Sequence, residues 1–93
     1  MSGNKTKTSE IKIQVDLNEN NLPIQMRWEA EGSNENQSIA SAFLLSLWDP
    51  NDKNTMKIDL WTKDMSVEEM KQFFHQSLLS MADTFEKATG ENL

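Results

Sequence analysis

The stretch 54–74, NTMKIDLWTKDMSVEEMKQFF, joins the two clearest patterns in the sequence. In its first half Met56, Ile58 and Leu60 fall on one side of an extended chain, and mostly charged residues fall on the other. This alternation predicts a strand over 54–62 that buries one face. Trp61 falls on the charged side. The largest apolar side chain of the strand is therefore expected at the surface.

A helix is predicted to begin directly after this strand. Ser66 followed by Glu69 is a capping box, and Met65 with Met70 forms a hydrophobic staple. Apolar residues then recur at steps of three and four, and Gly90 stands where a left-handed carboxy-terminal cap is expected, so we predict a helix to about residue 89. The stripe consists of Val67, Met70, Phe74, Ser77, Leu78, Met81, Phe85 and Ala88.

Three elements are predicted upstream. Strict alternation over 10–17 and again over 24–31 indicates two strands, and NENNLP at 18–23 is typical of a chain reversal between them. After a break at 32–37, apolar residues recur with a helical period, which predicts a short helix over 39–48 that ends before Pro50. Its apolar face consists of Ile39, Ala40, Phe43, Leu44, Leu47 and Trp48.

These elements predict an α+β fold with the order β-β-α-β-α. We expect a three-stranded, mainly antiparallel sheet with the third strand beside the first, and both helices packed on one face, because each strand has one apolar side. Residues 1–8 are polar and lack periodicity, so they are expected to be a disordered lead-in. Residues 9–93 form the single expected domain.

Composition narrows the functional classes. The chain has 93 residues, a net charge of -6 and no cysteine. The acidic balance disfavours binding to nucleic acid or anionic lipid, and the lack of cysteine removes disulfides and thiolate metal sites. No apolar run approaches the ~20 residues that cross a bilayer, and no secretory signal is visible at the amino terminus. We therefore expect a cytoplasmic protein without membrane insertion.

No catalytic, cofactor-binding or metal-binding residues are predicted. His75 is the only histidine, and its neighbours at three and four positions include no good metal ligand. Glu68 and Glu69 lie in the first helical turn, where the helix dipole favours acidic groups. The chain is expected not to be an enzyme. A small-ligand binder or enzyme built around His75 is the minor alternative.

Trp61 has two interpretations. Its ring either lies flat on the polar sheet face under the stems of Arg27, Lys57 and Lys63, or it anchors a partner protein, since tryptophan and arginine are enriched in interface hot spots. Trp28 and Trp48 fall on predicted core faces instead. The predicted partner-binding residues are Trp61, Arg27, Lys57, Asp59 and Lys63 on the sheet, together with Leu79 on the polar side of the last helix.

The segments KIDLWTKDM, MKQFFHQ and MADTFEKATG, within a similarity from about residue 9 to 90, resemble the gliding-motility protein GldC family of the Bacteroidetes. The resemblance implies a small cytoplasmic accessory factor of gliding and carries over no site residues. We therefore expect a non-catalytic protein that binds a protein partner, a component of the gliding machinery, through its open sheet face. The alternative is a symmetric homodimer that hides Trp61 by packing two sheets together or joining them edge to edge.

Overall fold

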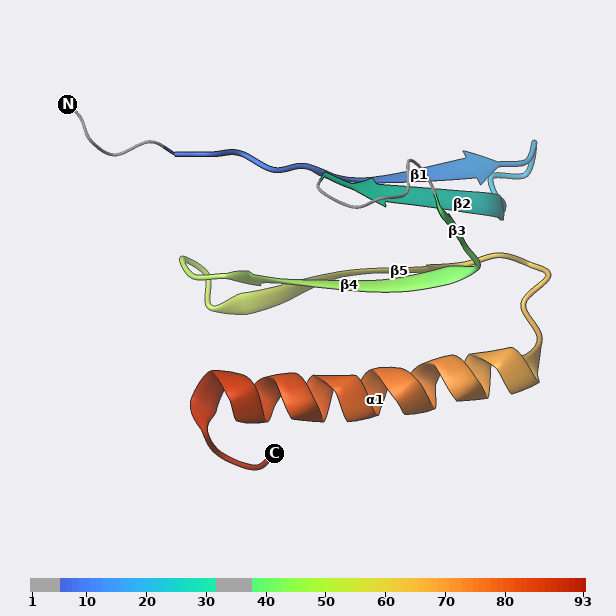
Figure 1. The fold of residues 1–93 in the computed structure, drawn as a ribbon. Helices are drawn as coiled ribbons and strands as arrows, with labels where there is room; N and C mark the ends of the chain where they lie inside the picture. Colours follow the sequence, from blue (N-terminus) through green and yellow to red (C-terminus); the bar gives the residue numbers. More distant parts are fainter. Residues whose placement is uncertain (1–5, 32–37) are drawn as a thin grey trace.

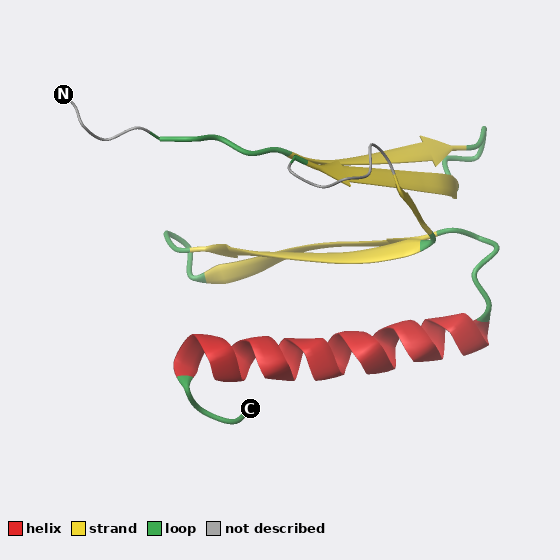
Figure 2. Cartoon of the chain, viewed as in Figure 1, coloured by secondary structure: helices red, strands yellow, loops and turns green. Residues whose placement is uncertain are grey.

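The computed structural model describes residues 6–31 and 38–93. Within them the chain forms β1 (Ile11–Leu17), β2 (Pro23–Ala30), β3 (Ser38–Ala40), β4 (Ala42–Asp49), β5 (Asn54–Trp61) and α1 (Val67–Thr89). The strands make two antiparallel sheets, β1-β2-β3 and β4-β5. Three layers result, with the β4-β5 pair between the first sheet and α1 (Figures 1 and 2). The fold is α+β, as expected, but with one helix rather than two.

The β1-β2 hairpin confirms the first two predicted strands and the reversal between them. The amide of Asn21 donates to the backbone carbonyl of Asn18 (2.9 Å), and the side-chain oxygen of Asn18 accepts from the amides of Asn20 (2.8 Å) and Leu22 (3.0 Å). Asn21 has a φ of 64°, a left-handed conformation that asparagine tolerates better than most residues. The asparagine-rich turn therefore satisfies its own backbone groups.

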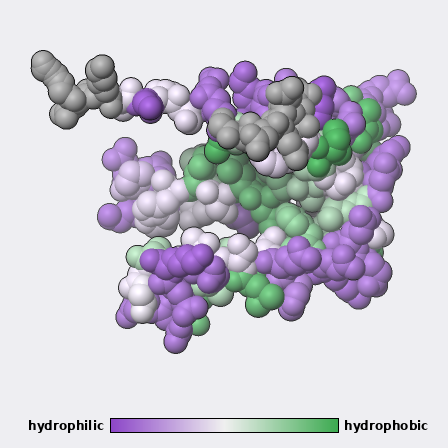
Figure 3. Space-filling model, viewed as in Figure 1, coloured by the Kyte–Doolittle hydropathy of each residue, from purple (hydrophilic) through white to green (hydrophobic). Residues whose placement is uncertain are grey.

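The core lies between the two sheets. Val15 pairs with Met26, and Met26 pairs with Ala40, so these three share a face of the first sheet. Met26 is the one apolar side chain among the described residues that is fully buried. Figure 3 shows other apolar side chains gathered between the sheets and still open to solvent on the side in view. The core is therefore small for the amount of apolar surface present.

The predicted helix over 39–48 is wrong, because this segment forms β3 and β4. Its run of apolar residues fits a period of two as well as a helical period, and such short runs are ambiguous on local grounds. Pairing with β5 resolves the ambiguity, because it places the apolar row of β4 beside the apolar row of β5 on the same face of the sheet. The pairs are Phe43 with Leu60, Leu45 with Ile58 and Leu47 with Met56.

Pro50 begins a hairpin turn instead of ending a helix. The side-chain oxygen of Asp49 accepts hydrogen bonds from the amides of Asn51 (2.9 Å) and Asp52 (3.3 Å). Lys53, with a φ of 53°, completes the reversal into β5. Proline and aspartate are as typical of such a turn as of a helix end, so the DPND signal at 49–52 fits both structures.

The predicted strand order is also wrong. β5 pairs with β4 and not with β1, so the strands form two sheets in place of one. Trp48, expected on a core face, is 63% exposed and lies on the same face of the β4-β5 pair as Trp61. Trp28 lies on the same face of the first sheet as Met26, as expected, although it is 42% exposed. The β4-β5 pair has a layer on each of its faces, whereas we expected both helices on the same face of a single sheet.

The predicted boundaries of the long helix are confirmed, since α1 begins after Ser66 and ends before Gly90. The hydroxyl of Ser66 accepts from the amide of Glu69 (3.1 Å), the carboxylate of Glu69 accepts from the amide of Ser66 (3.3 Å), and Gly90 adopts the left-handed cap with a φ of 76°.

In the described part of the chain, no helix is long and apolar enough to cross a membrane.

Two expectations fall partly or wholly outside the described residues. These are the lead-in, of which residues 1–5 are not described, and the break at 32–37. Residues 6–10 carry no regular secondary structure.

Replacement of Met26 by alanine should test the small core. We expect Met26→Ala to lower the free energy of unfolding by about 2–5 kcal/mol, because it leaves a cavity that the surrounding side chains fill only in part. Met56→Ala is the control, since Met56 is 58% exposed and its truncation should cost much less. Urea denaturation followed by circular dichroism measures both. Equal losses would contradict a core centred on Met26.

Candidate functional site

Trp61 is the last residue of β5, and the loop that follows brings α1 back beside it. Thr62 is buried, and its amide donates to the carbonyl of Ser41 (2.8 Å), which ties the loop to the start of β4. The amide of Met65 donates to the carbonyl of Thr62 (3.2 Å) and tightens the reversal. The capping box of Ser66 then starts the helix. The indole of Trp61 and the first turns of α1 are thereby held next to each other.

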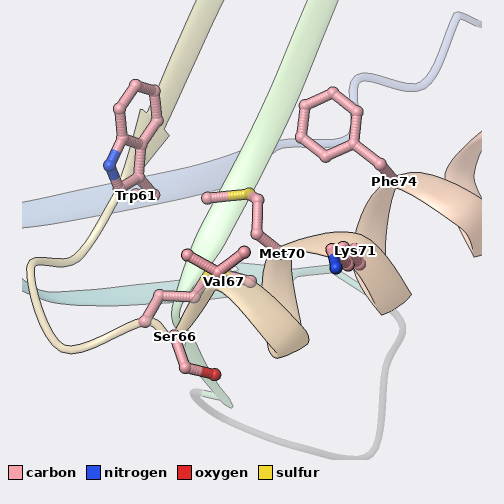
Figure 4. Close-up of a pocket in the computed structure, with 7 residues that line it drawn as sticks. Trp61, Ser66, Val67, Met70, Lys71 and Phe74 are labelled. Carbon is pink, nitrogen blue, oxygen red and sulfur yellow. The ribbon is translucent and has the colours of Figure 1, made fainter.

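An open hollow of about 490 Å³ lies between them, and we call it the Trp61 hollow. Figure 4 shows the side chain of Met70 extending from α1 toward the indole of Trp61, with Phe74 one turn further along the helix. Trp61 itself is 55% exposed. The lining consists of Trp61, Met65, Ser66, Val67, Met70, Lys71 and Phe74.

The walls of the Trp61 hollow are mainly apolar. Its polar lining residues are Ser66 and Lys71, and both have partners: the hydroxyl of Ser66 caps the helix, and the ammonium of Lys71 lies 3.6 Å from the carboxylate of Glu68. A surface of this kind suits an apolar side chain or a small apolar group, with charge held at the rim.

Trp61 also lines two smaller hollows. One, of about 290 Å³, lies between the β4-β5 pair and α1, where Phe73 and Leu44 contribute to its lining. The other, of about 210 Å³, lies toward the start of β2, where Leu22 and Pro23 contribute. The sequence led us to expect an open sheet face around Trp61. This face is instead partly covered, because α1 lies across part of it.

Four of the predicted partner-binding residues lie close together. Lys57, Asp59 and Trp61 project from the same face of β5, and the ammonium of Lys57 lies 3.5 Å from the carboxylate of Asp59. Lys63 joins Asp59 and Trp61 in lining the 210 Å³ hollow. Lys57, Asp59 and Lys63 therefore form a polar border on the strand side of the Trp61 indole.

Arg27 and Leu79 lie elsewhere. Arg27 belongs to the first sheet, where its guanidinium lies 3.0 Å from the carboxylate of Asp16. Leu79 is 60% exposed on α1 and lines none of the three hollows around Trp61. The six predicted residues are thus divided among three surfaces.

Sequence reasoning missed the helical half of the hollow. It assigned Met65 and Met70 to a staple and Val67 and Phe74 to the buried stripe, so none was considered for binding. A local signal was available, because the capping box at Ser66 places the first helical turn only a few residues after the exposed indole.

His75 remains an exposed residue of α1. Among the residues that the structure describes, no three or more His, Cys, Asp or Glu side chains are grouped so as to hold a metal ion.

The family described as gliding motility-associated protein GldC-like matches residues 23–93. The chain belongs to the GldC-like family. This confirms the expected family and its association with gliding motility. The GldC-like match begins at the first residue of β2, so it includes every residue of the Trp61 hollow, and β1 lies outside it. No curated protein and no solved structure matches the chain.

The capping box should matter for the stability of the site. We expect Ser66→Ala to lower the free energy of unfolding by about 1 kcal/mol, because the amide of Glu69 loses its acceptor. Ser80→Ala is the control: Ser80 is exposed within α1, where alanine is the better helix former. Thermal and urea unfolding of both variants measure the difference. A loss no larger for Ser66→Ala than for Ser80→Ala would refute the stabilising role of the cap.

Proposed function

We propose that this GldC-like protein is a non-catalytic, cytoplasmic accessory factor of gliding motility that binds another protein through the Trp61 hollow. The observation that carries the proposal is the exposed indole of Trp61 beside an apolar depression on α1. The family association with gliding motility supplies the cellular process.

The composition of the hollow supports a protein partner. Interface hot spots are enriched in tryptophan and sit where an apolar side chain fills a pocket and water is excluded around it. Here Val67, Met70 and Phe74 supply the apolar wall opposite Trp61. An apolar side chain of the partner inserted between Trp61 and Met70 would remove both from water.

The charged groups around the hollow support the same interpretation. Lys57 with Asp59 on β5 and Lys71 with Glu68 on α1 are ion pairs at the surface, and Lys63 lies beside the first pair. Exposed pairs add little stability but border the apolar centre with polar groups of both signs. The expected partner segment therefore carries an apolar anchor flanked by polar residues.

Truncation of Trp61 tests the proposal. We expect Trp61→Ala to weaken binding of the partner by about thirtyfold or more, because truncation of a hot-spot side chain costs ~2 kcal/mol or more. Affinity capture from the lysate of a gliding bacterium, with bound proteins quantified by mass spectrometry, measures the loss. A strain whose own copy carries the substitution should show reduced colony spreading.

Trp48→Ala is the matched control. Trp48 is 63% exposed and lies on the same face of the β4-β5 pair, at the opposite end from Trp61. It should retain the partner that the unmodified protein retains. The proposal fails if Trp61→Ala captures the same proteins in the same amounts as the unmodified chain, or if Trp48→Ala loses the partner equally.

A further inference from the structure

The two-stranded β4-β5 sheet has a free edge along β4. Within the described residues, β4 pairs with β5 and with no other strand, so its other edge carries backbone groups without strand partners. An exposed edge of this kind is a template for a further strand. A sheet of two strands gains the most from such an addition, because an isolated pair is only marginally stable.

The β4-β5 ladder fixes which backbone groups of β4 point to this free edge. The amide of Thr62 donates to the carbonyl of Ser41 (2.8 Å), so these two residues form a hydrogen-bonded pair at the start of the ladder. Hydrogen-bonded and non-hydrogen-bonded pairs alternate along an antiparallel ladder, so every second residue of β4 turns its amide and carbonyl away from β5. These residues are Ala42, Leu44, Ser46 and Trp48.

Of the four edge strands in the described part of the chain, β4 is the least protected against pairing. Native edges are commonly very short or carry charged residues that disfavour a further strand. β3 has three residues, and β1 carries Lys12 and Asp16. β5 carries Lys57 and Asp59. β4 has eight residues, and its one charged residue, Asp49, is the last and accepts hydrogen bonds within the hairpin turn.

A hollow of about 620 Å³ lies between the edge of β4 and α1, and we call it the β4 groove. Ala42, Phe43 and Leu44 all line it, although consecutive side chains of a strand point to opposite faces. The β4 groove therefore reaches the backbone at the edge of the strand. Ser77 and Ser80 on α1 add small side chains, and none of its described lining residues is charged. The β4 groove shares no lining residue with the Trp61 hollow.

A second copy of β4 matches this edge in an antiparallel register. Residues whose backbone groups point outward must face each other for hydrogen bonds to form between the two strands. This condition holds when Leu45 lies on a two-fold axis, and all of residues 42–48 then pair. Other registers that meet the condition are shorter, or they bring Pro50, which has no amide hydrogen, into the ladder.

The side chains of β4 complement their own copies on the face toward the first sheet. In this register Phe43 lies opposite Leu47 of the partner subunit, and Leu45 lies opposite its own copy. The apolar row of β4 therefore continues across the axis into the same row of the second chain. Leu47 is 55% exposed in the single chain, so it has apolar surface to bury there.

The face toward α1 pairs large side chains with small ones. Ala42 lies opposite Trp48 of the partner subunit, and Leu44 lies opposite Ser46 of the partner subunit. A two-fold interface requires such self-complementarity, because the same surface serves both chains. Trp48 is 63% exposed in the single chain, and a second copy would cover it.

The positions of the two helices also fit this arrangement. α1 lies over both strands of its own pair, since residues of β4, β5 and α1 line the hollow of about 290 Å³. The two-fold axis places the two α1 helices antiparallel, two strand spacings or ~9.6 Å apart. Packed helices are about 8–10 Å apart. Ser77 and Ser80, which line the β4 groove, allow the helices to approach closely.

We propose that the protein is a homodimer in which β4 pairs antiparallel with β4 of a second copy, with Leu45 on the two-fold axis. The product is one four-stranded sheet, in the order β5-β4-β4-β5, with both α1 helices on the same face. This contact differs from the homodimer considered in the sequence analysis, because it covers Trp48 and leaves Trp61 exposed. Trp61 belongs to β5, one strand away from the joined edges.

Two proline variants test the dimer by light scattering on a sizing column. The unmodified chain should have twice the chain mass of 10.7 kDa. Ser46→Pro should have the mass of one chain, because it removes an amide that bonds to the second copy and places a ring at the joined edge. A single-chain mass for the unmodified protein, or a dimer mass for Ser46→Pro, overturns the proposal.

Thr55→Pro is the matched control and should remain a dimer. Thr55 is exposed, and by the same alternation its amide points to the free edge of β5, so proline there removes no hydrogen bond of the β4-β5 ladder. Circular dichroism establishes that both variants are folded. Loss of the dimer in a folded Thr55→Pro would also overturn the proposal, because the edge of β5 plays no part in it.

Cross-linking keeps the test decisive if Ser46→Pro fails to fold. The chain has no cysteine, so Leu45→Cys introduces a single thiol. In the proposed register the two copies of residue 45 form a non-hydrogen-bonded pair with Cα atoms ~4.5 Å apart, which suits a disulfide. Mild oxidation should therefore link the two chains. No link through residue 45 would overturn the dimer.

Leu47→Cys is the control for the cross-link. Leu47 lies on the same face and is more exposed than Leu45, but in this register its two copies lie four residues apart along the strands. It should not form the disulfide, because the two thiols cannot meet. Equal linking through residues 45 and 47 would contradict the register.

The dimer and the proposed function fail separately. Trp61→Ala should lose the partner protein and keep the dimer mass, because the Trp61 hollow and the β4 groove share no lining residue. Ser46→Pro should lose the dimer mass and keep the partner protein. Loss of dimer mass in Trp61→Ala would contradict the dimer proposed here, whereas unchanged partner capture by Trp61→Ala would contradict only the function of the Trp61 hollow.

Discussion

The structure depends on the pairing of β4 with β5. A two-stranded sheet alone is only marginally stable, so this pair depends on packing against the other elements. Phe43, Leu45 and Leu47 join their partners on β5 to make one wholly apolar face, and the first sheet covers it. The opposite face, with Leu44, Trp61 and charged residues, lies toward α1. The three layers follow from these two unlike faces.

The unequal faces explain why Trp61 is half exposed. α1 follows β5 after a loop of five residues, 62–66, which is tied to β4 through Thr62, so the helix must begin close to the indole. The mixed face holds the helix at a distance, and hollows remain between them. The exposed tryptophan is thus a consequence of a helix that packs incompletely on a partly charged surface.

A small chain with two sheets and a helix has too few side chains to bury the apolar surface of every layer. Each layer is apolar on at least one side, yet 93 residues provide too few side chains to close every gap between layers. Met26 is fully buried, while Ile58 and Leu47, on the apolar face of the β4-β5 pair, remain about half exposed. Apolar surface that the fold leaves exposed is the physical basis of the protein contact proposed for the Trp61 hollow.

The sequence by itself determined the features that depend on residues only a few positions apart. The asparagine turn after β1, the capping box at Ser66 and the left-handed cap at Gly90 could be inferred from local patterns. The family was inferred from a resemblance that extends through most of the chain. The segment 38–49 could not, because its apolar run fits either period, and only pairing with β5 makes it a strand. The position of Trp61 beside Met70 was likewise decided by tertiary structure. Strand pairing and layer packing join residues distant in sequence, and the free energy of such contacts is not expressed in any local pattern.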